Sequence, residues 1–198
     1  MTSASRVSGD RSTTTAAPGR GVVAIGWVMA LWCIGFAAAN VVLIQETGHF
    51  ADSAFPEYAA GLSVLSWVVF ALKLLGAAVA LLSVSRLPGA LSPRLVAVLV
   101  WGAAALLGVY ALGSVVEAVG IVTGMTGSPD DITLKSIGYV LFFVLGAIGY
   151  GVLARSFSRR YETGRRTALV GLLGGPLMIG VILVAIPAVL VALGVMPA

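Results

Sequence analysis

Five long runs of apolar residues, separated by short polar stretches, make up most of this chain. Each run is long enough to cross about 30 Å of hydrocarbon at about 1.5 Å per helical residue. Only helices and closed barrels satisfy their backbone hydrogen bonds in lipid, and these runs are too long and too continuously apolar for barrel strands. The pattern therefore predicts an all-α, polytopic bundle of five transmembrane helices. The predicted spans are 21–44, 59–84, 95–122, 134–154 and 168–193.

Two serine–proline pairs predict where helices begin. The stretches "SPR" at 92–94 and "SPDD" at 128–131 each place a serine N-cap before a proline at the first helical position. Asp130 and Asp131 suit the positive end of a helix dipole, so we interpret them as a helix start and not as a metal site.

The fifth span carries the stretch "GLLGGP", in which Gly171 and Gly175 have the GxxxG spacing. Small residues at this spacing let two membrane helices approach closely, and we expect these glycines to form a helix contact. Pro176 and Pro187 are expected to kink or loosen the same helix.

Composition supports the membrane interpretation: 59% of the 198 residues are hydrophobic and 10% are charged, against about 25% charged in an average soluble domain. Basic and aromatic residues do not interleave as a nucleic-acid site requires, so no nucleic-acid partner is expected. Cys33 and His49 are the only cysteine and histidine. With one cysteine and one histidine, the sequence lacks the residues for an intrachain disulfide, a bis-histidine haem or a structural zinc site. Neither a metal nor a cofactor is expected.

The arginines predict the orientation, because positively charged loops stay on the cytoplasmic side. Residues 1–20 resemble a disordered cytoplasmic tail, and the basic segments alternate along the chain with acidic ones. The pattern predicts the N-terminus inside and the C-terminus outside. The basic loop after the fourth span can also contact anionic lipid headgroups. Its arginines are Arg155, Arg159, Arg160, Arg165 and Arg166.

A few polar residues interrupt the apolar runs. Helical periodicity places Ser63, Ser66 and Lys73 on one face of the second span, and Tyr110, Ser114 and Glu117 on one face of the third. With Asn40 of the first span, they can form a polar pocket open to the outside. In the alternative interpretation, serines bond to their own helix, tyrosines lie at the interface and Asn40 joins helices.

Lys73 is the most unusual of these residues, because a lysine in the middle of a span is costly in lipid. We expect its ammonium to pair with Glu117 across the second and third spans, directly or through Ser66, Ser114, Tyr110 or a water molecule. The alternative is that Lys73 reaches toward the interface and is merely tolerated.

The stretches "LKLLGAAVALL" in the second span and "GAAALLGVYALGSVVEAVG" in the third resemble a family of small bacterial integral membrane proteins of unknown function, of the GC-rich, actinobacterial type. This resemblance covers the first four spans and implies a multi-pass protein of the bacterial plasma membrane. No catalytic residue carries over from it.

Two functions remain open from the sequence. One is a non-enzymatic helper or interaction subunit that associates with another membrane protein or with itself. The other is a carrier or channel for a small solute or proton, working through the outward-facing pocket. An enzyme that acts on lipid or quinone is less supported, because the chain shows no nucleophile, metal cluster or cofactor loop.

Overall fold

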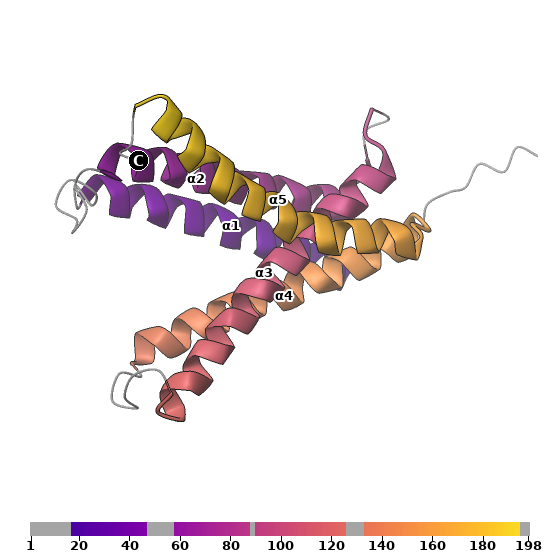
Figure 1. Ribbon diagram of the computed structural model, residues 1–198. Helices are drawn as coiled ribbons and strands as arrows, with labels where there is room; N and C mark the ends of the chain where they lie inside the picture. Colours follow the sequence, from indigo (N-terminus) through magenta and orange to yellow (C-terminus); the bar gives the residue numbers. More distant parts are fainter. Residues whose placement is uncertain (1–16, 47–57, 88–89, 126–132, 195–198) are drawn as a thin grey trace, which may run out of the picture.

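The computed structural model describes residues 17–46, 58–87, 90–125 and 133–194, and over these residues the chain is entirely helical, with no strand. Within this part it forms five helices, each long and apolar enough to cross a membrane. The predicted all-α fold of five membrane helices is confirmed. The helices are α1 (Arg20–Glu46), α2 (Ala59–Val84), α3 (Pro93–Val122), α4 (Leu134–Arg160) and α5 (Arg165–Ala192) (Figure 1).

One of the two predicted helix starts is confirmed. The Ser92 side chain accepts a hydrogen bond from the Leu95 amide, with proline at the first helical position of α3. The predicted cap at Ser128 is not the cap of α4. Thr133 takes that place, because it and Ser136 satisfy each other's backbone amides in a capping box. Ser128, Asp130 and Asp131 lie outside the described residues.

The basic segment between the last two helices is not a long loop, which corrects the sequence-based boundaries. Arg155, Arg159 and Arg160 lie inside α4, Arg165 begins α5, and only residues 161–164 connect the two helices. Hydropathy marks where hydrocarbon ends, whereas arginine is a good helix former and continues the helix beyond that point. Arg20 likewise begins α1, and residues 1–16 of the predicted tail lie outside the described part.

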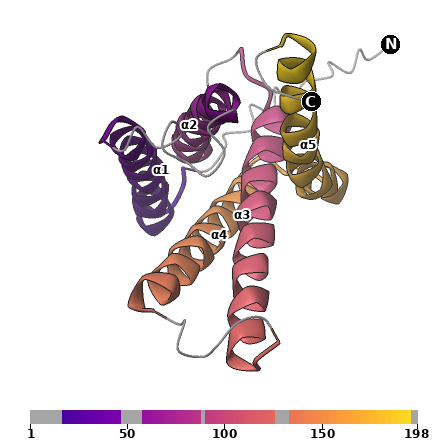
Figure 2. The ribbon, with the colours of Figure 1, turned by 60° about the vertical axis from the view of Figure 1, so that its left-hand side comes forward.

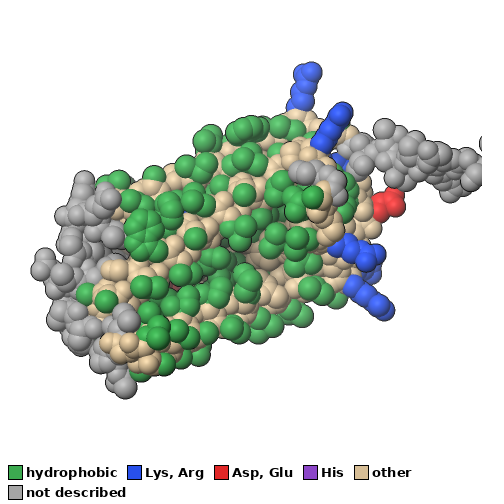
Figure 3. Space-filling view, turned by 90° about the horizontal axis from the view of Figure 1, so that it is seen from above, with side chains coloured by type: hydrophobic (Ala, Val, Ile, Leu, Met, Phe, Trp, Pro, Cys, Tyr) green, Lys and Arg blue, Asp and Glu red, His purple; other side chains and the backbone are tan. Residues whose placement is uncertain are grey.

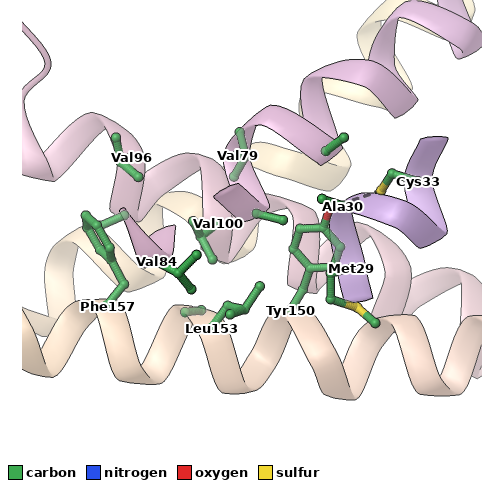
Figure 4. Packing of buried hydrophobic residues seen from close by; sticks show 14 residues of the cluster. Met29, Ala30, Cys33, Val79, Val84, Val96, Val100, Tyr150, Leu153 and Phe157 are labelled. Atoms are coloured by element: carbon green, nitrogen blue, oxygen red, sulfur yellow. Dashed lines mark hydrogen bonds between the residues drawn. The ribbon is translucent and has the colours of Figure 1, made fainter. Parts of the chain in front are cut away.

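The hydrophobic core lies at the end of the molecule that carries the arginines. It is built from the first halves of α1 and α3 and the second halves of α2 and α4. Tyr150, Phe157 and Leu153 of α4 are its largest fully buried side chains, and they meet Val96 and Val100 of α3 (Figure 4). The Lys and Arg side chains visible in Figure 3 gather beyond this core, while hydrophobic side chains cover the faces between the two ends.

Toward the other end the helices separate. α1 contacts mainly α2, and α3 contacts mainly α4 and α5. The hairpin of α3 and α4 diverges from α1 and α2 and from the second half of α5 (Figures 1 and 2). The molecule therefore has one compact end and one open end.

Glycines form the close contact that joins α5 to the rest of the bundle. Gly171 and Gly175 lie against α3, where a Cβ on Gly175 would be 2.6 Å from the Gly102 carbonyl oxygen. Beyond this contact α5 continues through Pro176 and Pro187 and bends away from α3 (Figure 1). A proline inside a helix removes one backbone hydrogen bond and clashes with the preceding turn, which accounts for a bend here.

Candidate functional site

The open end contains a cleft of about 1200 Å³ between α3, α4 and α5. Residues from 106 to 122 of α3, from 133 to 141 at the start of α4 and from 176 to 183 of α5 line it. Most of the lining is apolar. The polar side chains in it are those of Tyr110, Ser114, Glu117, Thr133, Ser136 and Tyr139.

The three polar residues predicted to share a face of α3 all line this cleft. Glu117 lies five positions before the last residue of α3. Ser114 and Tyr110 lie deeper in the cleft, and the distance along the helix axis from Glu117 to Tyr110 is about 10 Å. Glu117 is exposed, and its carboxylate forms no hydrogen bond or ion pair with the described residues. The cleft thus presents a row of hydrogen-bonding groups along an otherwise apolar wall.

Aromatic rings form the inner limit of the cleft. The rings of Tyr110 and Tyr139 lie 4.4 and 4.9 Å from that of Phe143, which is buried. Phe143 in turn contacts Phe36 of α1, at 5.9 Å between ring centres. The cleft therefore ends where the aromatic side chains of α1 and α4 join the two helix pairs.

Lys73 does not belong to this cleft. Its Nζ lies 3.6 Å from the centre of the Phe36 ring and 3.5 Å from the Phe36 carbonyl oxygen. The direct pairing expected between Lys73 and Glu117 is therefore wrong. α2 lies along α1, so the lysine meets an aromatic ring of α1, whereas Glu117 lies on the diverging half of α3.

The other residues of the predicted polar pocket also stay with α1 and α2. Ser63 donates to the Ala59 carbonyl in its own helix at 2.9 Å, as the alternative interpretation of the serines holds. Ser66 is partly buried on α2, and the buried Asn40 amide nitrogen has no hydrogen-bond acceptor among the described residues. The pocket expected from the sequence is thus divided between two separate parts of the fold.

One polar contact in the core was not expected from the sequence. The Cys33 sulfur and the Tyr150 hydroxyl form a hydrogen bond of 3.1 Å, with the two residues 4% and 1% exposed. Gly76 leaves the room for it, because a Cβ there would lie 3.1 Å from the sulfur and 3.2 Å from the hydroxyl oxygen. The hydrogen bond joins α1 to α4. Because both residues are buried, the Cys33 thiol is not an accessible nucleophile.

The five arginines of the predicted basic loop differ in their surroundings. Arg160 donates to the Ser83 carbonyl of α2, and its guanidinium lies 5.1 Å from the Tyr161 ring centre. Arg155, Arg159, Arg165 and Arg166 are exposed. Among the described residues, no three His, Cys, Asp or Glu side chains lie close enough together to hold a metal ion.

Comparisons with protein-family models, with curated proteins and with solved structures found no match for this chain. The resemblance to small bacterial membrane proteins stays an expectation. Over the described residues, the structure has five helices long and apolar enough to cross a membrane, as in a multi-pass membrane protein, and it is compact at its basic end and open at the other.

Proposed function

We propose that this protein is a non-enzymatic subunit of a membrane complex, and that it receives a transmembrane helix of another membrane protein in the cleft between α3, α4 and α5. One observation carries the proposal. The cleft is large, and Tyr110, Ser114 and Glu117 form a polar row along one of its walls.

The size of the cleft suits one helix. Three turns of a helix about 10 Å in diameter occupy roughly 1,300 Å³, close to the cleft volume of about 1200 Å³. A stretch of this length corresponds to the outer part of one membrane span.

The chemistry of the wall favours a helix over lipid tails. Acyl chains can cover the valines and leucines of the cleft, but they cannot form hydrogen bonds with Glu117, Ser114 or Tyr110. A partner helix with a basic or amide side chain at the level of Glu117 satisfies the carboxylate, which is the usual arrangement for a charge in a membrane segment. We therefore assign to the partner a small-residue face that bears one such side chain.

The carrier alternative has less support. It relied on Lys73 and Glu117 in one pocket, and these two residues lie on different parts of the fold. At the basic end the helices close around a buried core, with Tyr150, Phe157 and Val100 almost fully inaccessible. The geometry of the cleft suits a partner that binds from within the membrane.

We place the N-terminus in the cytoplasm of a bacterial cell and the cleft toward the outside. The charge distribution supports this orientation, because Arg20, Arg86, Arg94 and the arginines of α4 and α5 all belong to one end of the molecule. In this orientation the basic end faces the anionic headgroups of the inner surface.

Photo-crosslinking in cells tests the partner helix. A photoreactive residue at Val119 or at Leu183 lies in the cleft, where these side chains are 54% and 53% exposed. Leu173 of α5 is 65% exposed and does not line the cleft, so it is the matched control. We expect one protein adduct from the two cleft positions and none from Leu173. Mass spectrometry of the adduct should find a membrane-spanning peptide with a basic or amide residue.

Dependence on Glu117 completes the test. Glu117→Ala should abolish the adduct, while Glu162→Ala, which removes an exposed carboxylate between α4 and α5, should leave it unchanged. An adduct with the mass of a lipid, an adduct of two copies of this chain, or equal yields from the cleft and from Leu173 would each refute the proposed partner.

A further inference from the structure

A second cavity, of about 500 Å³, lies at the basic end between the start of α1 and the last turns of α4. It is distinct from the cleft and shares no residue with it. Arg155, Arg159 and Arg160 of α4 line it, together with Ser156, Gly19 and Val22. Three arginines therefore surround one small space.

These arginines lack anionic partners. Arg155 and Arg159 are four residues apart, a spacing at which like charges on a helix repel each other. Neither of them forms an ion pair with a carboxylate in the part of the chain that the structure describes. An anion held between them would turn this repulsion into two attractive contacts.

Arg160 is held in place from the opposite side. One of its terminal nitrogens donates to the Ser83 carbonyl, and its guanidinium lies 5.1 Å from the Tyr161 ring centre. Its Nε is buried and has no acceptor among the described residues. Arg160 thus contributes a fixed positive charge to the cavity wall.

The level of the cavity in the membrane indicates which anion fits. The apolar part of α4 ends just before Arg155, so we place the cavity at the boundary between hydrocarbon and headgroups. Val22 and Val152 form an apolar side of the same cavity, along which acyl chains can enter the bilayer. Phosphate oxygens accept the paired hydrogen bonds that a guanidinium offers, which makes a phosphate the best-matched anion.

We propose that this cavity binds the phosphate of an anionic phospholipid, with Arg155 and Arg159 as forked donors, the Ser156 hydroxyl as a third donor and Arg160 as the fixed charge behind them. The inference deepens the proposed contact of the basic end with anionic headgroups. It does not depend on the partner helix, so substitutions of these arginines should leave the crosslinks from Val119 and Leu183 unchanged.

Native mass spectrometry of the full chain tests the site. The protein is released from vesicles that contain phosphatidylglycerol in phosphatidylcholine, and the retained lipids are counted by mass. Arg155→Gln/Arg159→Gln is compared with Arg165→Gln/Arg166→Gln, which removes the same charge at the same end but outside the cavity. We expect the first variant to lose roughly tenfold or more of the retained phosphatidylglycerol and the second less than about threefold.

Three outcomes would overturn the proposal. Equal losses in the two variants would show a general attraction to a basic surface. Full retention by Arg155→Lys/Arg159→Lys would show that charge alone suffices, without the guanidinium fork. Finally, if about 10 mM inorganic phosphate in pure phosphatidylcholine raises the melting temperature as much as phosphatidylglycerol does, the ligand is free phosphate and not a lipid. Equal melting temperatures of the variants in pure phosphatidylcholine establish that all of them are folded.

Discussion

Gly102 of α3 and Gly175 of α5 meet backbone to backbone, and a Cβ on Gly175 would lie 2.7 Å from the Gly102 Cα. A backbone atom cannot swing aside as a flexible side chain can. The approach of the two helices at this point therefore depends on the absence of side chains, and α3 is the helix that α5 mainly contacts.

Gly175→Ala should destabilise the protein, because the added methyl group forces α3 and α5 apart. We expect a loss of about 1–3 kcal/mol, as for overpacking of a core. Gly174→Ala is the matched control, since a Cβ at Gly174 meets nothing within 4 Å. A gain of up to about 1 kcal/mol is expected there from the better helix propensity of alanine. Thermal unfolding in detergent measures both variants, and equal stabilities would argue against this contact.

Lys73 and Phe36 should show energetic coupling. The ammonium lies over the ring, a contact worth about 0.5–2 kcal/mol depending on how far it is desolvated. Lys73→Met should nevertheless raise stability, because a lysine within a span costs roughly 2.5–3.5 kcal/mol. We expect Phe36→Leu to cost less in the Lys73→Met background than in the natural chain.

A neighbouring ring provides the control for this cycle. Phe142 stacks on Trp32 at 4.4 Å between ring centres and belongs to the same aromatic cluster, without the lysine above it. Phe142→Leu should therefore cost the same with and without Lys73. A cycle in which Phe36 behaves like Phe142 would contradict the cation–π contact.

Lys73 and Glu117 should act independently, since the first contacts α1 and the second lines the cleft. The stability changes of Lys73→Met and Glu117→Gln should add in the double variant to within about 0.5 kcal/mol. Urea or thermal unfolding of the three variants measures this. A double variant more stable than the sum by well over that margin would restore the pairing expected from the sequence.

The orientation can be tested with reporter fusions. With five spans and the N-terminus inside, a C-terminal alkaline phosphatase should be active and a C-terminal green fluorescent protein dark. Fusions after Thr163, between α4 and α5, should give the opposite pattern. The reversed result at both positions would invert the topology and place the cleft on the cytoplasmic side.

The sequence predicts the positions of the helices well, but it does not predict which helices pack against one another. Long apolar runs predict helical spans because lipid admits only helices and closed barrels, and these runs are too long for barrel strands. Periodicity likewise places Tyr110, Ser114 and Glu117 on one face of α3. It does not say which helix that face meets, because apolar residues cover all sides of a membrane helix. Periodicity alone therefore suggests a partner for Lys73 on α3, whereas α2 lies along α1 and brings Lys73 to Phe36.

For a related reason, the sequence does not predict contacts between residues that have no distinctive pattern around them. Gly171 and Gly175 attract notice by their spacing, but their partner Gly102 is an isolated glycine in a long apolar run. The hydrogen bond between Cys33 and Tyr150 joins residues far apart in the chain, and neither has a distinctive pattern around it. Such contacts become visible only when the arrangement of the helices is known.

Because α3 and α4 diverge from the other helices, the molecule is broader at its open end than at its basic end (Figure 1). A body that is narrow at its basic end and broad at the other displaces more area from one leaflet than from the other. We therefore expect it to act as a wedge, so that a membrane containing many copies lowers its elastic energy by bulging toward the broad end. A partner helix in the cleft, as proposed above, would fill the space between the separated helices and so hold the broad end open.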